Sequence, residues 1–368
     1  MQASEITARL HRGRTGLAQL RATWQQLVPR LARRRFFHEW GWIDAWLQEL
    51  EPQPDAVLFV ELQRAGRCVA IVPLVAHRQQ RAGLTLRVLA LPEHDHLPLG
   101  DILCDRDVDG AAVLQALARG LAQAGIAWDV LRFSMVMNES SLVAGVAAAG
   151  MAWRAEPIKI CAQVDCDMSW EQFAARLSGN FRSNLNKARH KLAREAGVRF
   201  DVAATESEIN AVFDTFLAIE ASGWKGAKGT AIACRPELVR FYRRLIAQFA
   251  PEDRLRISTL SVGEHAIAAQ FCPLDGDTLY VYKLGYDEEY SRFAPGNSLI
   301  EKMVRVGGEQ RRFRWLNLVG NPPWFEQWKP TGSEVRLFLV YGPTWRARAL
   351  RVLQRLRALL RRMSPRPT

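Results

Sequence analysis

Hydrophobic residues recur at helical or strand spacing through residues 39–150. Trp42 and Trp46 lie four positions apart among other apolar residues, which predicts an amphipathic helix over residues 39–50. Two apolar runs in residues 56–79 flank a polar Arg-Ala-Gly-Arg step, which predicts a β-hairpin. Similar patterns predict further strands and helices at residues 84–91, 113–124, 128–133 and 141–149. Together these elements predict one complete α/β lobe.

The second half of the chain repeats this order with more helices ahead of its strands. Helical patterns cover residues 169–177, 181–196, 206–221 and 237–249, and strand patterns cover 255–262, 266–273 and 278–286. A helix beginning near Pro295 and strands at 313–319 and 335–341 follow. The pattern predicts an α/β (α+β) fold of two lobes, each with a mixed, mostly antiparallel sheet flanked by helices. We place these lobes at residues 1–155 and 156–342, ahead of a helix and tail at 343–368.

Residues 345–363 predict a basic amphipathic helix. Its apolar residues recur at helical spacing, and seven Arg and no acid lie between Trp345 and Arg362. The apolar positions are Leu350, Leu353, Leu356, Leu360 and Met363. Two interpretations remain open: the leucines pack on the second lobe, or the helix lies on an acidic membrane surface.

Composition adds charge and location to this picture. The net charge of +12 predicts an anionic partner, for which coenzyme A, transfer RNA, a nucleotide-linked sugar and an acidic membrane qualify, and DNA is not expected. No stretch reaches the roughly 18 consecutive apolar residues of a membrane span, and the first residues contain no secretory signal. We therefore expect a cytoplasmic protein that can attach peripherally to the inner membrane.

The cysteine and histidine positions argue against a metal. Six cysteines are scattered without a CxxC pair, which predicts small buried residues rather than zinc ligands or disulfides. His94 and His96 have ligand-like spacing within residues 93–96, but only Asp101 lies nearby as a third ligand. We expect no metal, and interpret this segment as a loop.

The strongest chemical signal is the turn Pro295-Gly296-Asn297-Ser298, which follows a strand and opens a helix. Helix N-termini carry unpaired N–H groups and a partial positive charge that suit a pyrophosphate. Pro295 suits a first helical turn, and Gly296 permits close backbone approach. An ordinary strand-to-helix turn would look the same in sequence.

Residues 288–300, EEYSRFAPGNSLI, resemble the acyl-CoA loop of GNAT acetyltransferases. Ser291 stands at the loop's Arg/Gln position, Ala294 at its first Gly position, and Gly296 keeps the motif glycine. The segments 219–232 and 180–200 resemble the CelD-like GNAT acetyltransferases, which are associated with cellulose and exopolysaccharide biosynthesis. That family is similar to FemAB-type aminoacyl transferases, which are tandem GNAT folds.

The resemblance implies an acyl-CoA donor, such as acetyl-CoA, bound by Ser291, Pro295, Gly296, Asn297 and Ser298. The acceptor must lose a proton, and a carboxylate or an ordered water serves as the base. Glu220 is our first candidate, and its alternative is a solvated carboxylate on a helix face.

The remaining candidates come from other segments of the second half of the chain. Lys225, in a Gly-rich loop, is a candidate for binding a phosphate or carboxylate, and a mobile surface loop is the alternative. Tyr282 is a candidate general acid, although a core or cleft wall suits it as well. Candidate substrate-binding residues are Asn180, Arg182, Trp224, Gln270 and Lys283.

These observations predict an acyl-CoA-dependent N- or O-acyltransferase of envelope polysaccharide or lipid metabolism, with a glycan, lipid or amine acceptor. A FemAB-like enzyme that uses aminoacyl-tRNA is one alternative, favoured by the positive charge. A non-catalytic GNAT scaffold in a membrane-associated synthase is the other.

Overall fold

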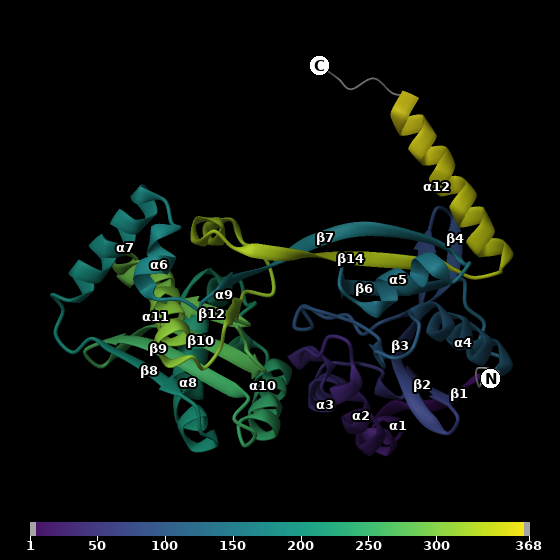
Figure 1. Ribbon diagram of the computed structural model, residues 1–368, viewed down its shortest axis with the longest axis horizontal. Coiled ribbons are helices and arrows are strands. Elements are labelled where there is room, and N and C mark those ends of the chain that lie inside the picture. Colours follow the sequence, from purple (N-terminus) through teal and green to yellow (C-terminus); the bar gives the residue numbers. More distant parts are fainter. Residues whose placement is uncertain (1–4, 364–368) are drawn as a thin grey trace. The chain divides into compact units, whose positions relative to one another are not determined.

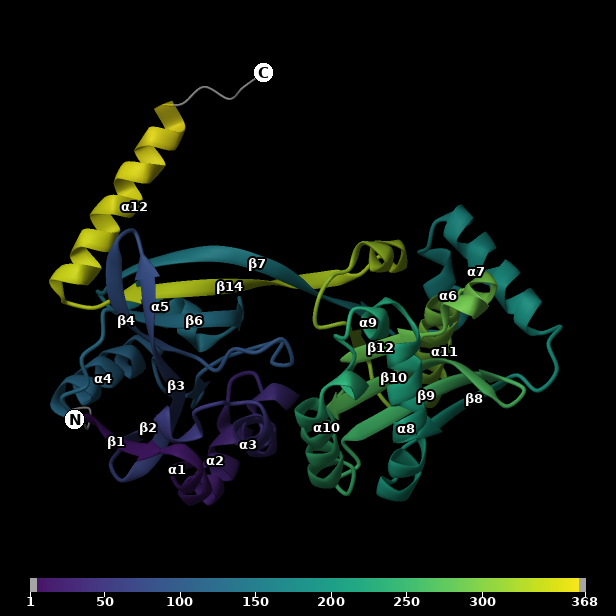
Figure 2. The ribbon, with the colours of Figure 1, turned by 180° about the vertical axis from the view of Figure 1, so that it is seen from behind.

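The computed structural model describes residues 5–363, except the side chains of Trp224 and residues 357–363 (Figures 1 and 2). The chain forms two units. Unit 1 comprises Met1–Trp40, Pro52–Ile158 and Glu334–Thr368, and unit 2 comprises Gly41–Glu51 and Lys159–Ser333. Both units are therefore built from separate stretches of sequence.

The sheet of unit 1 has the strand order β1-β2-β3-β4-β6-β14. Neighbouring strands are antiparallel except β4 and β6, which are parallel. The β2–β3 hairpin turns at Ala65 and Gly66, both with positive φ, as a tight two-residue turn requires. The strands are β1 Ile6–Arg12, β2 Val57–Arg64, β3 Arg67–Arg81, β4 Leu84–Ala90, β5 Leu103–Cys104, β6 Val130–Met137 and β14 Thr331–Tyr341.

Helices α1, α2, α4, α5 and α12 complete unit 1. Asp109 and Ser140 cap α4 and α5 by accepting a backbone N–H of the first turn. Leucine, valine and alanine side chains from α4 and α5 pack with β2, β3 and β6 in the core. The helices are α1 Gly13–Gln19, α2 Arg21–Leu27, α4 Gly110–Gln123, α5 Ser141–Ala148 and α12 Trp345–Met363, with short 3₁₀ turns at Val28–Arg30, Phe36–His38 and Pro54–Ala56.

The last strand of the chain completes the sheet of unit 1. Phe338 and Val340 of β14 are buried in the unit 1 core, and β14 pairs antiparallel with β6. Sequence order had assigned residues 335–341 to the C-terminal lobe. The assignment was wrong because alternation identifies a strand without identifying its neighbour.

In unit 2 the strand order is β7-β13-β11-β10-β9-β8, and β12 pairs with β10. β11 and β13 are parallel, and the other pairs are antiparallel. The strands are β7 Ala152–Asp165, β8 Arg199–Ala203, β9 Leu255–Val262, β10 His265–Asp275, β11 Thr278–Tyr280, β12 Lys283–Tyr286 and β13 Trp315–Asn317. The helices are α3 Trp40–Glu49, α6 Trp170–Ala175, α7 Gly179–Leu192, α8 Glu206–Ser222, α9 Trp224–Ala227, α10 Pro236–Phe249 and α11 Pro295–Gln310, with 3₁₀ turns at Ile232–Cys234, Glu288–Phe293 and Pro323–Trp328.

Helix α3 packs in unit 2, although its sequence lies far from the rest of that unit. The Trp42 ring makes edge contacts with Phe241 of α10 and with Tyr282, at centroid distances of 5.6 and 5.4 Å. Glu49, at the end of α3, forms ion pairs with two arginines of α10: Arg240 at 2.8 Å and Arg244 at 3.1 Å. Residues 41–51 had been placed in the N-terminal lobe, and long-range packing corrects that placement.

The predicted basic helix forms as α12, and it packs on unit 1. Ala347 and Leu350 are buried in a cluster with Leu86 and Val88 of β4. Its packing on the second lobe, one of the two expected arrangements, is therefore wrong. No helix in the described part of the chain is both long and apolar enough to cross a membrane.

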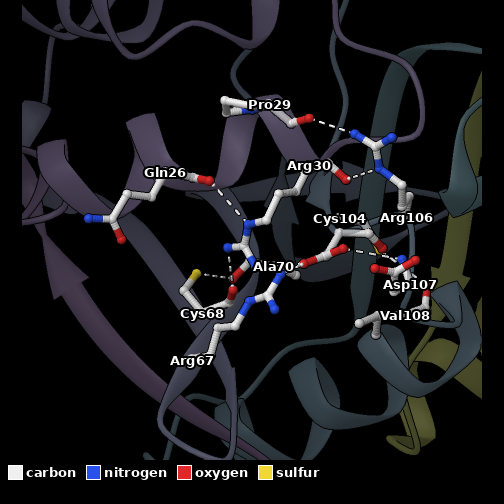
Figure 3. Close-up of polar contacts among 11 residues, drawn as sticks. Gln26, Pro29, Arg30, Arg67, Cys68, Ala70, Cys104, Arg106, Asp107 and Val108 are labelled. Atoms are coloured by element: carbon white, nitrogen blue, oxygen red, sulfur yellow. Dashed lines mark hydrogen bonds and ion pairs between the residues drawn. The ribbon is translucent and has the colours of Figure 1, made fainter.

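A buried carboxylate ties the first helices of unit 1 to its sheet (Figure 3). Asp105 Oδ2 accepts hydrogen bonds from Arg30 at 2.7 Å and from Arg67 at 3.0 Å. Arg30 also donates to the carbonyl of Cys68 at 2.8 Å, and Arg106 donates to the carbonyl of Pro29 at 2.6 Å. Paired in this way, Asp105 is buried without an uncompensated charge.

The cysteines are free, and five of the six are buried, as the sequence predicted. Burial raises the pKa of Cys68 to about 12 and that of Cys104 to about 11, so both thiols stay protonated at neutral pH. Cys234 is the exception, because it is exposed.

Candidate functional site

A cavity of about 480 Å³ lies at the N-terminus of α11. Four of the residues predicted to hold the donor line it together: Ser291, Pro295, Gly296 and Asn297. Ser298 does not, because its hydroxyl is buried and donates to the carbonyl of Phe293 at 2.9 Å. The other lining residues are Leu284, Tyr286, Ala294 and Trp324.

Helix α11 starts at a left-handed residue followed by a proline. Ala294 caps the helix with φ +45° and ψ +53°, a left-handed conformation that glycine adopts most easily. Pro295 then fixes the first helical φ, and Ser298 N–H makes the first i→i−4 bond to Ala294. Asn297 Oδ1 accepts from Trp328 Nε1 at 3.0 Å, which orients the Asn297 side chain.

This helix end suits an anion. The first N–H groups of a helix have no intrahelical acceptor, no side chain caps them here, and the first turn contains no acid. A Cβ on Gly296 would lie 3.6 Å from Tyr286 and 3.8 Å from Leu284, two residues of the cavity wall. The residues present therefore fit a pyrophosphate that approaches the backbone at Gly296.

Two parallel strands separate beside this cavity. Tyr280 of β11 pairs with Asn317 of β13, and Val281 N–H donates to Asn317 O at 2.7 Å. β12 then pairs only with β10 among the described strands. The predicted continuous strand 278–286 is therefore interrupted, and the interruption leaves one edge of β12 free where Leu284 and Tyr286 reach the cavity.

Glu220 is buried at the end of α8, so the alternative of a solvated carboxylate is wrong. Its Oε1 pairs with Lys225 Nζ at 2.8 Å, and its Oε2 accepts from Ile232 N–H at 2.8 Å. Lys225 Nζ also donates to the carbonyl of Leu284 at 3.3 Å. The Glu220–Lys225 pair thus joins the Gly-rich segment to β12, next to a residue of the cavity wall.

Tyr282 lies between β11 and β12 in a cluster of aromatic rings. It stacks on Tyr242 at 5.8 Å, and Trp42 and Phe271 contact its edge. Burial raises the pKa of Tyr282 far above its ordinary value, so the phenol stays protonated at neutral pH. Lys283 Nζ lies 5.0 Å from the Tyr282 ring.

Gln270 of β10 is fully buried on the strand opposite Leu284. Its Oε1 accepts from Cys272 Sγ at 3.7 Å, whereas its Nε2 has no hydrogen-bond partner among the described residues. Leaving a buried donor unpaired costs free energy of folding, so this amide would be stabilised by a hydrogen bond to a ligand or water.

Three of the residues predicted to bind substrate are not placed at the cavity. Asn180 and Arg182 are exposed on α7 and do not line the cavity. The Trp224 side chain lies outside the described residues. Two residues of this region were not among the predicted site residues. Trp42 contacts Tyr282, and its only local signal in the sequence is helical spacing. Trp324 lines the cavity and lies in a Pro- and Trp-rich turn.

His94 and His96 of the expected loop lie next to each other, with ring centroids 5.5 Å apart. His94 Nδ1 accepts from the backbone N–H of His96 at 3.1 Å. In the described part of the chain, no group of three or more His, Cys, Asp or Glu side chains is arranged to hold a metal.

Comparison with known protein families gives one match, to part of the chain. Residues 179–330 match the family described as acetyltransferase (GNAT) domain, and this stretch contains α11, the cavity and Glu220. The matched residues all belong to unit 2. No curated protein in the comparison matches the sequence significantly.

Solved structures share the fold over most of the chain. The chain aligns with FemX at a TM-score of 0.57 and 10% identity, over 86% of this chain and 95% of that one. It aligns with the C-terminal domain of a candidate lysylphosphatidylglycerol synthetase from Agrobacterium fabrum at a TM-score of 0.53 and 13% identity, over 92% and 96%. At such identities the likeness shows the fold alone.

Proposed function

We propose that the protein is an acyltransferase that binds an acyl-CoA at the N-terminus of α11 and transfers the acyl group to an amine or hydroxyl. The carrying observation is the cavity of about 480 Å³ that gathers Ser291, Pro295, Gly296 and Asn297. The GNAT match over residues 179–330 supports the reaction class. Backbone N–H groups at the helix end hold the pyrophosphate, and the free edge of β12 directs the thioester into unit 2.

The reaction is a nucleophilic substitution at the thioester carbonyl. The acceptor nitrogen or oxygen bonds to the carbonyl carbon, the C–S bond breaks, the acceptor loses a proton and the leaving thiolate gains one. Glu220 is the proposed proton acceptor, with Lys225 and Ile232 N–H fixing its carboxylate. Tyr282 is the proposed proton donor, because it directly precedes β12, whose Leu284 and Tyr286 line the cavity. Positioning supplies most of the rate gain.

Donor binding is tested by thermal unfolding of the full chain with acetyl-CoA, longer acyl-CoAs and coenzyme A alone. A ligand at a hundredfold excess over its Kd stabilises the folded state by about 2.7 kcal/mol. A clear rise in Tm with at least one acyl-CoA is expected. No rise with any of them would favour the non-catalytic scaffold.

The proton acceptor is tested by Glu220→Gln, which keeps the shape of the side chain and its bond from Ile232 N–H. Loss of the base should lower kcat by about 10²- to 10⁴-fold with little change in donor KM. Glu206→Gln, an exposed change in the same helix, is the matched control. A variant that loses only Tm would show that Glu220 anchors the loop and does not transfer protons.

We further propose that the acceptor is a glycan, lipid or amine of envelope polysaccharide or lipid metabolism, on the resemblance of residues 219–232 to CelD-like enzymes. A competing function is FemAB-like transfer from aminoacyl-tRNA. The net charge of +12 favours it, as do Ser291 and Ala294 at two motif positions of the donor loop. Affinity for tRNA that falls steeply with salt, without stabilisation by acyl-CoA, would select that alternative.

A further inference from the structure

One face of α12 remains apolar and uncovered after the helix has packed. Trp345, Val352 and Leu356 are 63%, 54% and 50% exposed. At 100° per residue, positions i, i+7 and i+11 lie within about 40° of one another, so the three side chains form a single stripe. The stripe runs for roughly 16 Å along the helix axis.

This stripe is not the apolar face that holds the helix to unit 1. Ala347 and Leu350, which pack on β4, project from the opposite side of α12. Tyr341 Oη and Gln354 Oε1 lie 2.6 Å apart and add a polar contact on the packed side. The second half of α12 extends beyond the sheet of unit 1 in both views (Figures 1 and 2). One face of α12 therefore packs on unit 1, and the face with Trp345, Val352 and Leu356 is exposed.

The charge beside the stripe identifies a partner. Arg348 and Arg355 are exposed, and helical spacing places both along one border of the stripe. Seven Arg and no acidic residue lie between Trp345 and Arg362, so the helix itself offers no carboxylate to neutralise them. An aromatic and aliphatic stripe bordered by arginines is the pattern of a helix that lies in the interface of an anionic bilayer.

We propose that α12 docks the protein on an anionic lipid surface, with Trp345, Val352 and Leu356 inserted among the acyl chains and Arg348 and Arg355 over the headgroups. Trp suits this boundary because its ring is apolar and its N–H stays hydrated. Each Arg near such a surface strengthens binding roughly fivefold, so several Arg together with a short apolar stripe give reversible attachment. Because α12 stays packed through Ala347 and Leu350, docking requires no unfolding of unit 1.

The experiment is sedimentation of the full chain with phosphatidylcholine vesicles, with and without phosphatidylglycerol. Binding is expected only with phosphatidylglycerol and should weaken as salt is added. Arg348→Gln combined with Arg355→Gln should weaken binding roughly 25-fold. Val352→Asp combined with Leu356→Asp should abolish it.

Arg9→Gln combined with Arg12→Gln, which removes the same charge from exposed positions on β1, is the matched control and should bind as the wild type does. Circular dichroism checks that every variant stays folded. Equal binding to neutral vesicles, or full binding by the Val352 and Leu356 variant, would overturn the proposal. Self-association of the wild type without lipid, lost in the Val352 and Leu356 variant, would also overturn the proposal. The stripe would then bind a second copy of the chain.

Discussion

Gln270 is a fully buried polar residue of unit 2. Its Nε2 lacks a partner among the described residues. Gln270→Met keeps the side-chain volume and removes the unpaired donor, so the free energy of unfolding should rise by about 1–2 kcal/mol in the absence of ligand. Urea unfolding measures this change. If Gln270 binds substrate as proposed, KM should rise in the same variant, and a drop in stability would contradict the prediction.

Asp101 and His38 form a second buried pair, in unit 1. Asp101 accepts from Ser140 at 2.6 Å and lies 3.8 Å from Arg35 and 3.9 Å from His38. Burial raises the pKa of Asp101 to about 6, and burial together with Arg35 lowers the pKa of His38 to about 3. Between pH 4 and 6 the folded state therefore holds a proton on Asp101 that the unfolded state lacks, and lacks a proton on His38 that the unfolded state holds.

These two effects on stability have opposite signs and cancel over that window. Asp101→Asn removes one of them, so stability should fall by about 1.4 kcal/mol for each pH unit as pH drops from 6 to 4. Denaturant unfolding at several pH values measures the slope. His38→Gln should show the opposite slope, with stability rising as pH drops. Wild-type and Asp101→Asn profiles of the same shape would contradict this account.

At the scale of elements, the start of α11 carries the proposed donor site. Gly296→Ala should favour the helix, with a stability gain of up to about 1 kcal/mol, because a Cβ fits at ordinary contact distance. The same methyl group enters the cavity, so donor KM should rise about tenfold, or ~1.4 kcal/mol. Gly179→Ala at the start of α7, where a Cβ meets nothing within 4 Å, is the control. Steady-state kinetics with unchanged donor KM would contradict the assignment.

The sequence predicted this helix start because its signals are local: a proline, a glycine and short polar residues in one turn. It did not predict the break between β11 and β12, since Thr278 to Tyr286 is as apolar as one continuous strand. It also did not predict the burial of Glu220, because the partners that neutralise it, Lys225 and Ile232 N–H, meet it only after the chain has turned. Strand pairing and side-chain burial depend on residues far away in the sequence, which local hydrophobic periodicity does not identify.

At the scale of the whole molecule, each unit is made of separate stretches of the chain, which the sequence pattern did not predict. Phe338 comes from the last strand and is buried in the core of unit 1. Phe338→Ala should destabilise that unit by about 3–5 kcal/mol, measured by calorimetry or limited proteolysis. Trp345→Ala, an exposed aromatic change in the same unit, should leave its stability unaltered. Equal effects of the two changes would contradict the placement of β14.

The position of β14 also constrains how the protein can be made. A ribosome synthesises residues 5–158 long before Glu334–Tyr341, so the edge of β6 has no partner during most of translation. An unpaired edge beside exposed core residues invites association with other nascent chains. The sheet of unit 1 is therefore completed only after unit 2 has been translated, although most of unit 1 is translated before it.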